Sequence, residues 1–133
     1  MILLDTDVVV DCLRGLPAAD VWLRESADQM FAIPGIVAME LIVGCRDKAD
    51  LQRTQAFISL FDVIWPEAPE IKRAFDLLVA YRLQFGVSIP DCIVAAIALE
   101  RGMTLYTFNL KHYRMFPGLE VREPYTRARV PEK

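Results

Sequence analysis

The chain has 133 residues, of which 54% are hydrophobic and 25% are charged, so we expect one globular domain and exclude a disordered chain. Its net charge of −3 at pH 7 and its pI of about 5.1 exclude a basic nucleic-acid coat protein. No apolar run reaches the length of a membrane span, and no basic leader precedes the first apolar stretch. We therefore expect neither a membrane anchor nor a signal peptide.

Short apolar segments alternate with helical patterns along the chain. The apolar segments predict strands at 2–4, 30–33, 63–65 and 104–107, with a small fifth strand at 119–121. Periodicity and helix-boundary residues predict helices at 7–14, 18–28, 36–45, 49–61, 67–85 and 88–101, and a helical turn at 109–114. This alternation predicts an α/β fold with a short, mostly parallel central sheet of four to five strands covered by helices.

The apolar faces of the helices predict what each helix covers. The segment at 36–45 is apolar almost all round, which predicts a buried helix. In the helix at 67–85, the periodicity places Ile71, Phe75, Leu78 and Phe85 on the inner face. Apolar faces on helices such as 49–61 have two interpretations: they cover the sheet, or they bury against a second subunit or a partner protein.

The three cysteines, Cys12, Cys45 and Cys92, lie in apolar segments without C-x-x-C or Cys/His spacing. This pattern is typical of reduced, buried thiols in a cytoplasmic protein. A zinc site is therefore not expected.

Three acidic residues lie in segments that are otherwise too apolar to face water. Asp5 follows the strand segment ILL, Glu40 lies inside IVAMELIVG, and Asp91 opens PDCIVAAIAL. No basic residue lies among the helical neighbours of Glu40, which are Ile36, Val37, Val43 and Gly44. A buried carboxylate is costly unless something compensates its charge, so these three positions require an explanation.

Each acidic residue has an ordinary structural interpretation. Asp91 fits a helix cap, Asp5 or Asp7 fits a cap of the helix after the first strand, and Glu40 fits a carboxylate turned out at a helix end. In a parallel sheet, however, ligands bind beyond the carboxyl ends of the strands, where Asp5 lies. If the three acids converge there, they need a countercharge, and oxygen ligands suit Mg²⁺ or Mn²⁺. Asp11 is expected to be an ordinary helical residue.

A basic patch begins at Lys111, His112 and Arg114 and continues as Arg122, Arg127, Arg129 and Lys133. It has two interpretations, a surface that steers a nucleic-acid backbone or a solvated face with a frayed tail. We expect a nuclease-like domain at 1–122 and a basic C-terminal tail at 123–133.

The order of several motifs carries a resemblance to a known family. LLDTDVVVDCLRG at 3–15, IVAMELIVG at 36–44, IPDCIVAAIALERG at 89–102 and TLYTFNLKHY at 104–113 span nearly the whole chain. In this order they resemble the PIN-domain proteins, and within them the VapC ribonuclease toxins of prokaryotic type II toxin–antitoxin pairs. The resemblance implies a PIN-like three-layer α/β/α sandwich.

The resemblance also implies roles for individual residues. Asp5, Glu40 and Asp91 match the acidic residues that ligate the metal and carry catalysis. Thr6 and Thr107 match small hydroxyl residues behind the site. Three further positions vary within the family: Asp7 stands where asparagine or serine is usual, Asn109 where many members have a fourth acid, and His112 where members have an acid or histidine.

The activity that the resemblance implies is Mg²⁺- or Mn²⁺-dependent endonucleolytic cleavage of RNA (tRNA, rRNA or mRNA) in the cytoplasm. In that mechanism the metal presents a water for in-line attack on the phosphodiester, while Lys111, His112 and Arg114 steer the RNA. The implied partners are a small VapB-like antitoxin, whose C-terminal segment fills the active-site groove, and a second copy of the chain. The pair would form a heterotetramer or a larger assembly.

Other functions remain open at this point. The chain also fits a PIN-fold RNA-processing nuclease, or a module that binds RNA or a partner without efficient cleavage. Asp5-Thr6-Asp7 resembles the first motif of haloacid dehalogenase-like phosphatases, in which Asp5 would be a nucleophile and Asp7 a general acid/base. A receiver-like signalling domain would also gather acids at strand ends, but VIWPEAP and YTFNLKH lack its further acid and lysine.

Overall fold

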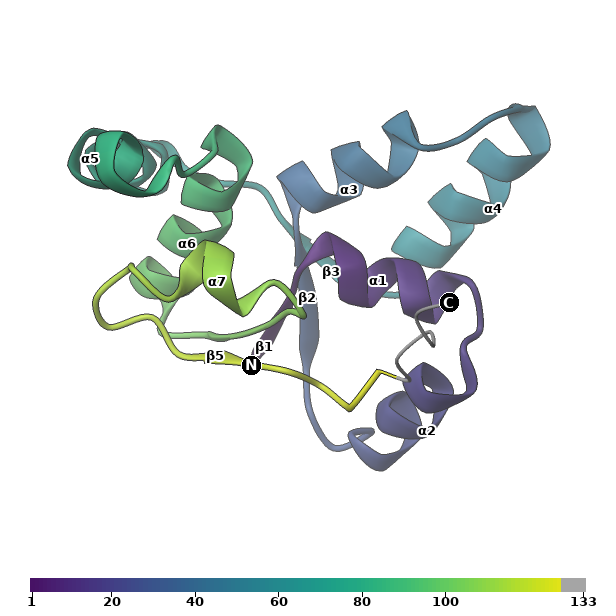
Figure 1. The fold of residues 1–133 in the computed structure, drawn as a ribbon. Helices are drawn as coiled ribbons and strands as arrows, with labels where there is room; N and C mark the ends of the chain where they lie inside the picture. The colour runs from purple at the N-terminus through teal and green to yellow at the C-terminus, as the bar shows by residue number, and fades with distance from the viewer. Residues whose placement is uncertain (128–133) are drawn as a thin grey trace, which may run out of the picture.

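Five parallel strands form the central sheet of the protein, for which a computed structural model describes residues 1–127 (Figure 1). The strands are β1 (Ile2–Leu4), β2 (Phe31–Pro34), β3 (Asp62–Ile64), β4 (Thr104–Tyr106) and β5 (Val121–Arg122). Their order in the sheet is β3-β2-β1-β4-β5, and every neighbouring pair is parallel. The predicted short sheet is confirmed, and all of its described strand pairs are parallel.

Helices cover both faces of this sheet. They are α1 (Thr6–Leu13), α2 (Pro17–Glu25), α3 (Gly35–Val43), α4 (Lys48–Ile58), α5 (Ala68–Phe85), α6 (Ile89–Arg101) and α7 (Leu110–Tyr113). Parallel crossovers are right-handed, and the chain moves outward from β1 to β3 before it returns to β4. Consequently α1, α2 and α4 lie on one side of the sheet, and α5, α6 and α7 lie on the other (Figure 1). The predicted three-layer α/β/α sandwich is confirmed.

The core lies where both layers meet the central strands. Leu3 and Leu4 of β1, and Leu105 of β4, are completely buried. Five consecutive residues of α6, from Val94 to Ala98, are also buried. A strand covered on both faces needs apolar residues at every position, which explains why ILL does not alternate with polar residues.

The start of α6 places Asp91 at the same end of the sheet as Asp5. Ser88 caps the helix, because its hydroxyl accepts a hydrogen bond of 3.2 Å from the Asp91 amide. Pro90 fits the first turn, where its missing N–H costs nothing. The helix ends at Gly102, whose φ of 62° is left-handed.

The predicted inner face of the helix at 67–85 is wrong. Ile71, Phe75 and Phe85 are 45%, 56% and 47% exposed, whereas Ala74 and Leu77 face the core. The reason is that α5 packs mainly on α6, whose small side chains cover only a narrow stripe. Leu78, partly buried, is the one predicted residue that packs against the core.

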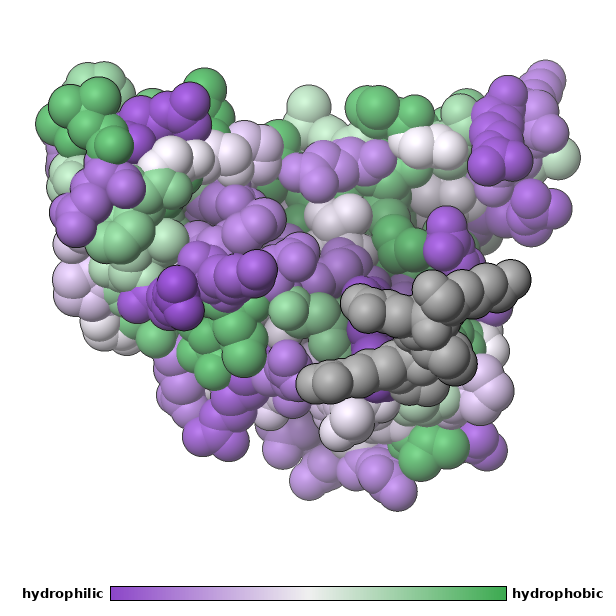
Figure 2. Space-filling view, in the orientation of Figure 1, coloured by the Kyte–Doolittle hydropathy of each residue, from purple (hydrophilic) through white to green (hydrophobic). Residues whose placement is uncertain are grey.

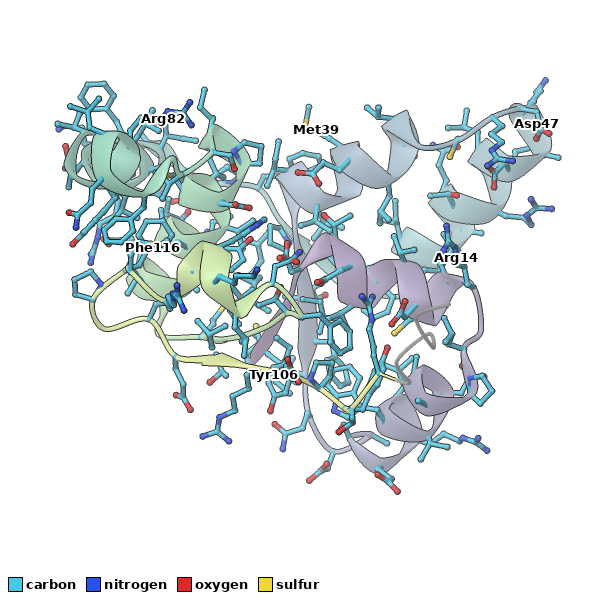
Figure 3. All side chains as sticks on the ribbon, in the orientation of Figure 1. Arg14, Met39, Asp47, Arg82, Tyr106 and Phe116 are labelled. Atoms are coloured by element: carbon cyan, nitrogen blue, oxygen red, sulfur yellow. The ribbon has the colours of Figure 1, made fainter. Side chains whose placement is uncertain are left out.

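The prediction that the helix at 36–45 is buried is also wrong for one face of α3. Met39 is 54% exposed and Val43 is 84% exposed. Figure 3 shows Met39 pointing away from the sheet. This face of α3 and one face of α5 therefore both expose apolar side chains to solvent.

Two of the three cysteines are buried as expected. Cys12 and Cys92 are buried, and burial raises the pKa of each thiol to about 11. Cys45 is only partly buried, and no disulfide joins the three within residues 1–127. No helix in this part of the chain is long and apolar enough to cross a membrane.

An ion pair between the buried Glu70 carboxylate and the partly exposed Arg101 guanidinium joins α5 to α6. Glu70 is 5% exposed and accepts hydrogen bonds of 2.7 and 3.0 Å from the Arg101 guanidinium. The same carboxylate accepts a bond from the backbone amide of Glu67, which closes a capping box. The Arg101 hydrogen bonds are the main cause that lowers the pKa of Glu70 below its ordinary value of 4.5.

We expect Glu70→Gln to lower the free energy of unfolding by about 1–2 kcal/mol at neutral pH, because the charge-assisted hydrogen bonds between the buried Glu70 carboxylate and the partly exposed Arg101 guanidinium are weakened. A lowered pKa means that this stability is present above pH 4.5 and is lost as the pH falls through the folded-state pKa. Urea unfolding of wild type and variant should therefore converge in acid. A difference that is independent of pH would contradict the account.

Candidate active site

A polar pocket of about 320 Å³ lies at the carboxyl ends of β1 and β4. β1 is the strand at which the sheet order reverses, which is where α/β sheets bind ligands. Figure 2 shows hydrophilic residues across the face between α7 and α3. The lining residues are Asp5, Thr6, Asp7, Glu40, Ser88, Pro90, Asp91, Val94, Asn109 and His112. The structure therefore brings together the three acids that the sequence singled out.

Asp5 is the most buried of these acids, with 8% of its surface exposed. Its Oδ1 accepts a bond of 2.9 Å from the Thr6 amide, so that it also caps α1. Its Oδ2 lies 2.9 Å from the Thr107 hydroxyl and 3.0 Å from the Tyr113 hydroxyl. Burial, followed by the nearby charge of Asp7, raises the pKa of Asp5 to about 6. The capping and ligand interpretations of Asp5 are thus compatible.

Tyr113 links two of the three acids, and the motif analysis assigned it no role. Its side chain is completely buried, and its hydroxyl lies 3.0 Å from Asp5 Oδ2 and 3.1 Å from Asp91 Oδ1. Burial and the two carboxylates raise the pKa of this phenol, so it stays protonated. A phenol has one hydrogen, so it donates to only one carboxylate at a time. In the sequence Tyr113 lies in the basic stretch Lys111-His112-Tyr113-Arg114, and nothing in that stretch indicates a buried contact.

Asp7 connects α1 to the turn after β4. Its Oδ1 accepts from the Val8 amide at 2.8 Å, and its Oδ2 accepts from the Phe108 amide at 2.9 Å. The Thr107 hydroxyl lies 3.4 Å from the same Oδ2. Burial is the main cause that raises the pKa of Asp7. Asp7 thus holds backbone groups beside the pocket.

Glu40 and Thr6 meet across the pocket from α3 and α1. The Thr6 hydroxyl donates a bond of 2.9 Å to Glu40 Oε2, and Glu40 itself is exposed. A carboxylate turned toward the pocket agrees with the absence of a basic helical neighbour in the sequence. Thr6 therefore orients the acid, in keeping with the auxiliary position predicted for it.

Residues of the predicted basic patch divide into separate groups. His112 lies at the pocket, with Nδ1 at 3.4 Å from Asp91 Oδ2. Lys111 and Arg114 are exposed on the same short helix, α7, and Asn109, which is also exposed, precedes it. Arg122 pairs with Glu120 at 2.6 Å. Arg129 and Lys133 lie outside the described residues.

Asp11 is a buried anchor, so the prediction of an ordinary helical residue is wrong. It accepts bonds from the Tyr125 hydroxyl at 2.7 Å and from two nitrogens of Arg127 at 3.0 and 3.1 Å. Its two partners come from the segment assigned to the tail at 123–133, more than a hundred residues away in sequence. Sequence spacing alone gives no signal for such a contact.

The charge balance of the pocket indicates what it can hold. Four carboxylates line it, from Asp5, Asp7, Glu40 and Asp91, and His112 is the one nitrogen base among the lining side chains. Hard oxygen donors suit Mg²⁺ or Mn²⁺. Among residues 1–127, no group of three or more acidic, histidine or cysteine side chains is gathered tightly enough to hold an ion as it stands. The donor set, which consists mainly of carboxylate oxygens, therefore fits a divalent cation.

Comparison with known proteins agrees with this fold. The PIN domain family model matches residues 2–115, so the chain belongs to the PIN domain family. Ribonuclease VapC19 of Mycobacterium tuberculosis is 37% identical over 125 residues, which cover 90% of this chain and 98% of the relative. Ribonuclease VapC10 of the same organism is 33% identical over 122 residues, covering 90% and 91%.

Solved structures share the architecture. A toxin–antitoxin complex from Klebsiella pneumoniae contains a chain that is 31% identical, with a TM-score of 0.75 and coverage of 94% of this chain and 98% of that one. VapBC2 from Rickettsia felis, bound to a DNA fragment from its promoter, has a TM-score of 0.77 at 23% identity, with coverage of 92% and 98%. This second likeness supports the fold.

We expect Asp5→Asn to stabilise the metal-free protein by about 1–3 kcal/mol near pH 7.5, because ionised Asp5 is buried beside Asp7. A pKa raised from 3.8 to about 6 means that wild-type stability is greatest below pH 3.8 with respect to this group and falls as the pH rises through 6. Urea unfolding in the presence of a chelator measures both effects. Asp76→Asn, an exposed change on α5, is the control. A less stable Asp5→Asn protein at pH 7.5 would contradict the account.

Proposed function

We propose that the chain is a metal-dependent endoribonuclease and the toxin component of a type II toxin–antitoxin pair. The observation that carries the proposal is the convergence of Asp5, Glu40 and Asp91 on one pocket at the strand-order switch. The relatives named ribonucleases, and the toxin–antitoxin complex at 31% identity, support the reaction and the biological role. An RNA-processing nuclease of the same fold would use the same site.

Asp5, Glu40 and Asp91 would hold the ion, with Mg²⁺ as the expected metal and Mn²⁺ as a substitute. When bound, a divalent cation supplies Lewis-acid activation of a phosphoryl oxygen and a water of lowered pKa. The chain's own contribution is to fix its ligands. Thr107 and Tyr113 fix Asp5, Thr6 fixes Glu40, and the Ser88 cap fixes the backbone of Asp91. Asp7 and Asn109 are auxiliary residues at the pocket wall.

RNA is the proposed substrate, and α7 is the proposed RNA-binding surface. Lys111 and Arg114 are exposed on the helix that also carries His112, beside Asp91. Their charges would attract phosphates to a pocket that is otherwise acidic. This arrangement is compatible with the negative net charge, because only a local basic surface is needed.

The phosphatase alternative fits the geometry poorly. As a nucleophile, Asp5 would need a free, accessible carboxylate oxygen, but both of its oxygens accept hydrogen bonds and its surface is 8% exposed. As a general acid, Asp7 would need contact with a leaving group, but its Oδ2 accepts the Phe108 amide. Both acids suit electrostatic and structural roles instead.

The partners proposed are a VapB-like antitoxin and a second copy of the chain, acting in the cytoplasm. The exposed apolar face of α5, formed by Ile71, Phe75, Val79, Leu83 and Phe85, is the proposed dimer surface. An apolar groove of about 220 Å³ between α5 and α6 extends this face. Figure 2 shows the corresponding apolar surface at the upper left. Exposed apolar patches of this kind mark protein contacts.

We expect Asp91→Asn to reduce RNA cleavage by about a hundredfold or more, because the site loses one charged ligand oxygen. Cleavage of a structured RNA by wild type should need Mg²⁺ or Mn²⁺ and stop with a chelator. Asp76→Asn provides a matched control on the surface. Cleavage that survives both chelation and Asp91→Asn would overturn the metal mechanism, and phosphomonoesterase activity that needs Asp7 but not Glu40 would favour a phosphatase.

We expect Leu83→Glu to convert a wild-type dimer into a monomer, because Leu83 is fully exposed on the apolar face of α5. A buried charge would oppose association by several kcal/mol. Light scattering coupled to size-exclusion chromatography gives the mass directly. Val21→Glu, on α2, should leave the dimer intact. A monomeric wild type, or a dimeric Leu83→Glu variant, would show that α5 is not the dimer surface.

A further inference from the structure

We infer that Arg127 and Tyr125 form a clamp that positions the active site from the C-terminal segment. The inference rests on the proposed function and adds two residues that the motifs did not identify. Both residues bind Asp11, which lies one helical turn along α1 from the pocket residue Asp7. In the sequence, they had been assigned to a separate basic tail.

Asp11 holds the clamp on α1. Its side chain is 8% exposed, and it accepts one bond from Tyr125 and two from the Arg127 guanidinium, at distances from 2.7 to 3.1 Å. A bidentate arginine contact fixes both the position and the orientation of the guanidinium. The buried Asp11 carboxylate is thereby paired with a positive charge and a hydroxyl donor.

Arg127 and Tyr125 also contact Phe108, in the turn between β4 and α7. The Arg127 guanidinium carbon lies 3.9 Å from the centre of the Phe108 ring, which is a cation–π contact. The Tyr125 ring meets the same Phe108 ring edge to face, with 5.1 Å between centroids. Phe108 is therefore held by two residues of one short segment.

The turn that contains Thr107 and Phe108 also binds two acids of the pocket. Thr107 donates to Asp5, and the Phe108 amide donates to Asp7 Oδ2. The Arg127 guanidinium also donates to the backbone carbonyl of Asp7 at 3.3 Å. Arg127 thus contacts both elements that hold the Asp5 and Asp7 carboxylates, α1 and the turn after β4.

This arrangement gives Arg127 the role of a positioning residue. Arg127 is not among the residues that line the pocket, so the role inferred for it acts through the residues that it holds in place. Rigid support behind a site matters because small displacements of ligating groups cost large factors in rate. Loss of the clamp should leave the sheet intact while the turn at 107–109 becomes mobile.

The test compares Arg127→Met with Arg24→Met, which removes an exposed arginine that bonds only the Asp20 carbonyl of its own helix. Hydrogen exchange measured by NMR should show about tenfold weaker protection of the Phe108 amide in Arg127→Met and no change in Arg24→Met. RNA cleavage by Arg127→Met should show kcat lowered about tenfold with KM nearly unchanged, partly restored by added guanidinium ion at subdenaturing concentrations.

The double variant Asp11→Asn with Arg127→Met covers the case in which the single variant unfolds, since it leaves no buried unpaired charge. It should fold and show the same weakened protection at Phe108. Unchanged protection and unchanged kcat in a folded variant would overturn the clamp. A wild type without RNA cleavage would count against the proposed function, and the exchange measurement would still decide for or against the clamp.

Discussion

The buried Asp5 carboxylate and the partly buried Asp91 carboxylate share one hydrogen-bond donor, the Tyr113 hydroxyl, and the rest of the site is built around this constraint. Asp5 and Asp91 both lie within hydrogen-bond distance of the Tyr113 hydroxyl, which can donate to only one of them. Asp7 and Glu40 add further negative charge to the same pocket. Burial of the ionised Asp5 carboxylate beside Asp7 opposes folding, as the raised pKa of Asp5 indicates. The same charge would favour the binding of the divalent cation proposed for this pocket.

The order of the strands in the sheet explains where the pocket lies. Parallel strands end at one edge, and the reversal of strand order at β1 opens a crevice there. Residues that follow β1 and β4, and residues of the first turn of α6, line the pocket there. Hydroxyl groups from Thr6, Thr107 and Tyr113 then fix each acid in turn. The apolar faces of α3 and α5 lie away from it, which leaves room for protein partners beside an open site.

The order of strands and helices and the three acids of the site could be predicted from the sequence, because buried segments are visible as apolar runs. ILL, IVAMELIVG and PDCIVAAIAL are too apolar to face solvent, so an acid in or beside each of them stood out, and the strand and helix order followed from the alternation of patterns. Tyr113 and Asp11 could not be assigned in this way. The role of each depends on partners about a hundred residues distant, such as Asp5 for Tyr113 and Arg127 for Asp11.

The exposed faces were also beyond prediction from periodicity. An apolar stripe on α5 predicts that something covers it, but the stripe does not distinguish the chain's own sheet from a partner. Ala74 and Leu77 face α6 because small residues allow the helices to approach closely, and the larger Ile71 and Phe75 are left outside. A pattern that is too apolar for one buried face therefore indicates a second contact.

The most direct test of the central claim is a crystal structure with Mn²⁺, in which anomalous scattering locates the ion without reference to activity. The account predicts an anomalous peak in the pocket lined by Asp5, Glu40 and Asp91, and loss of that peak in Asp5→Asn. Full occupancy of a site elsewhere with an empty pocket, or a peak that persists unchanged in Asp5→Asn, would contradict it.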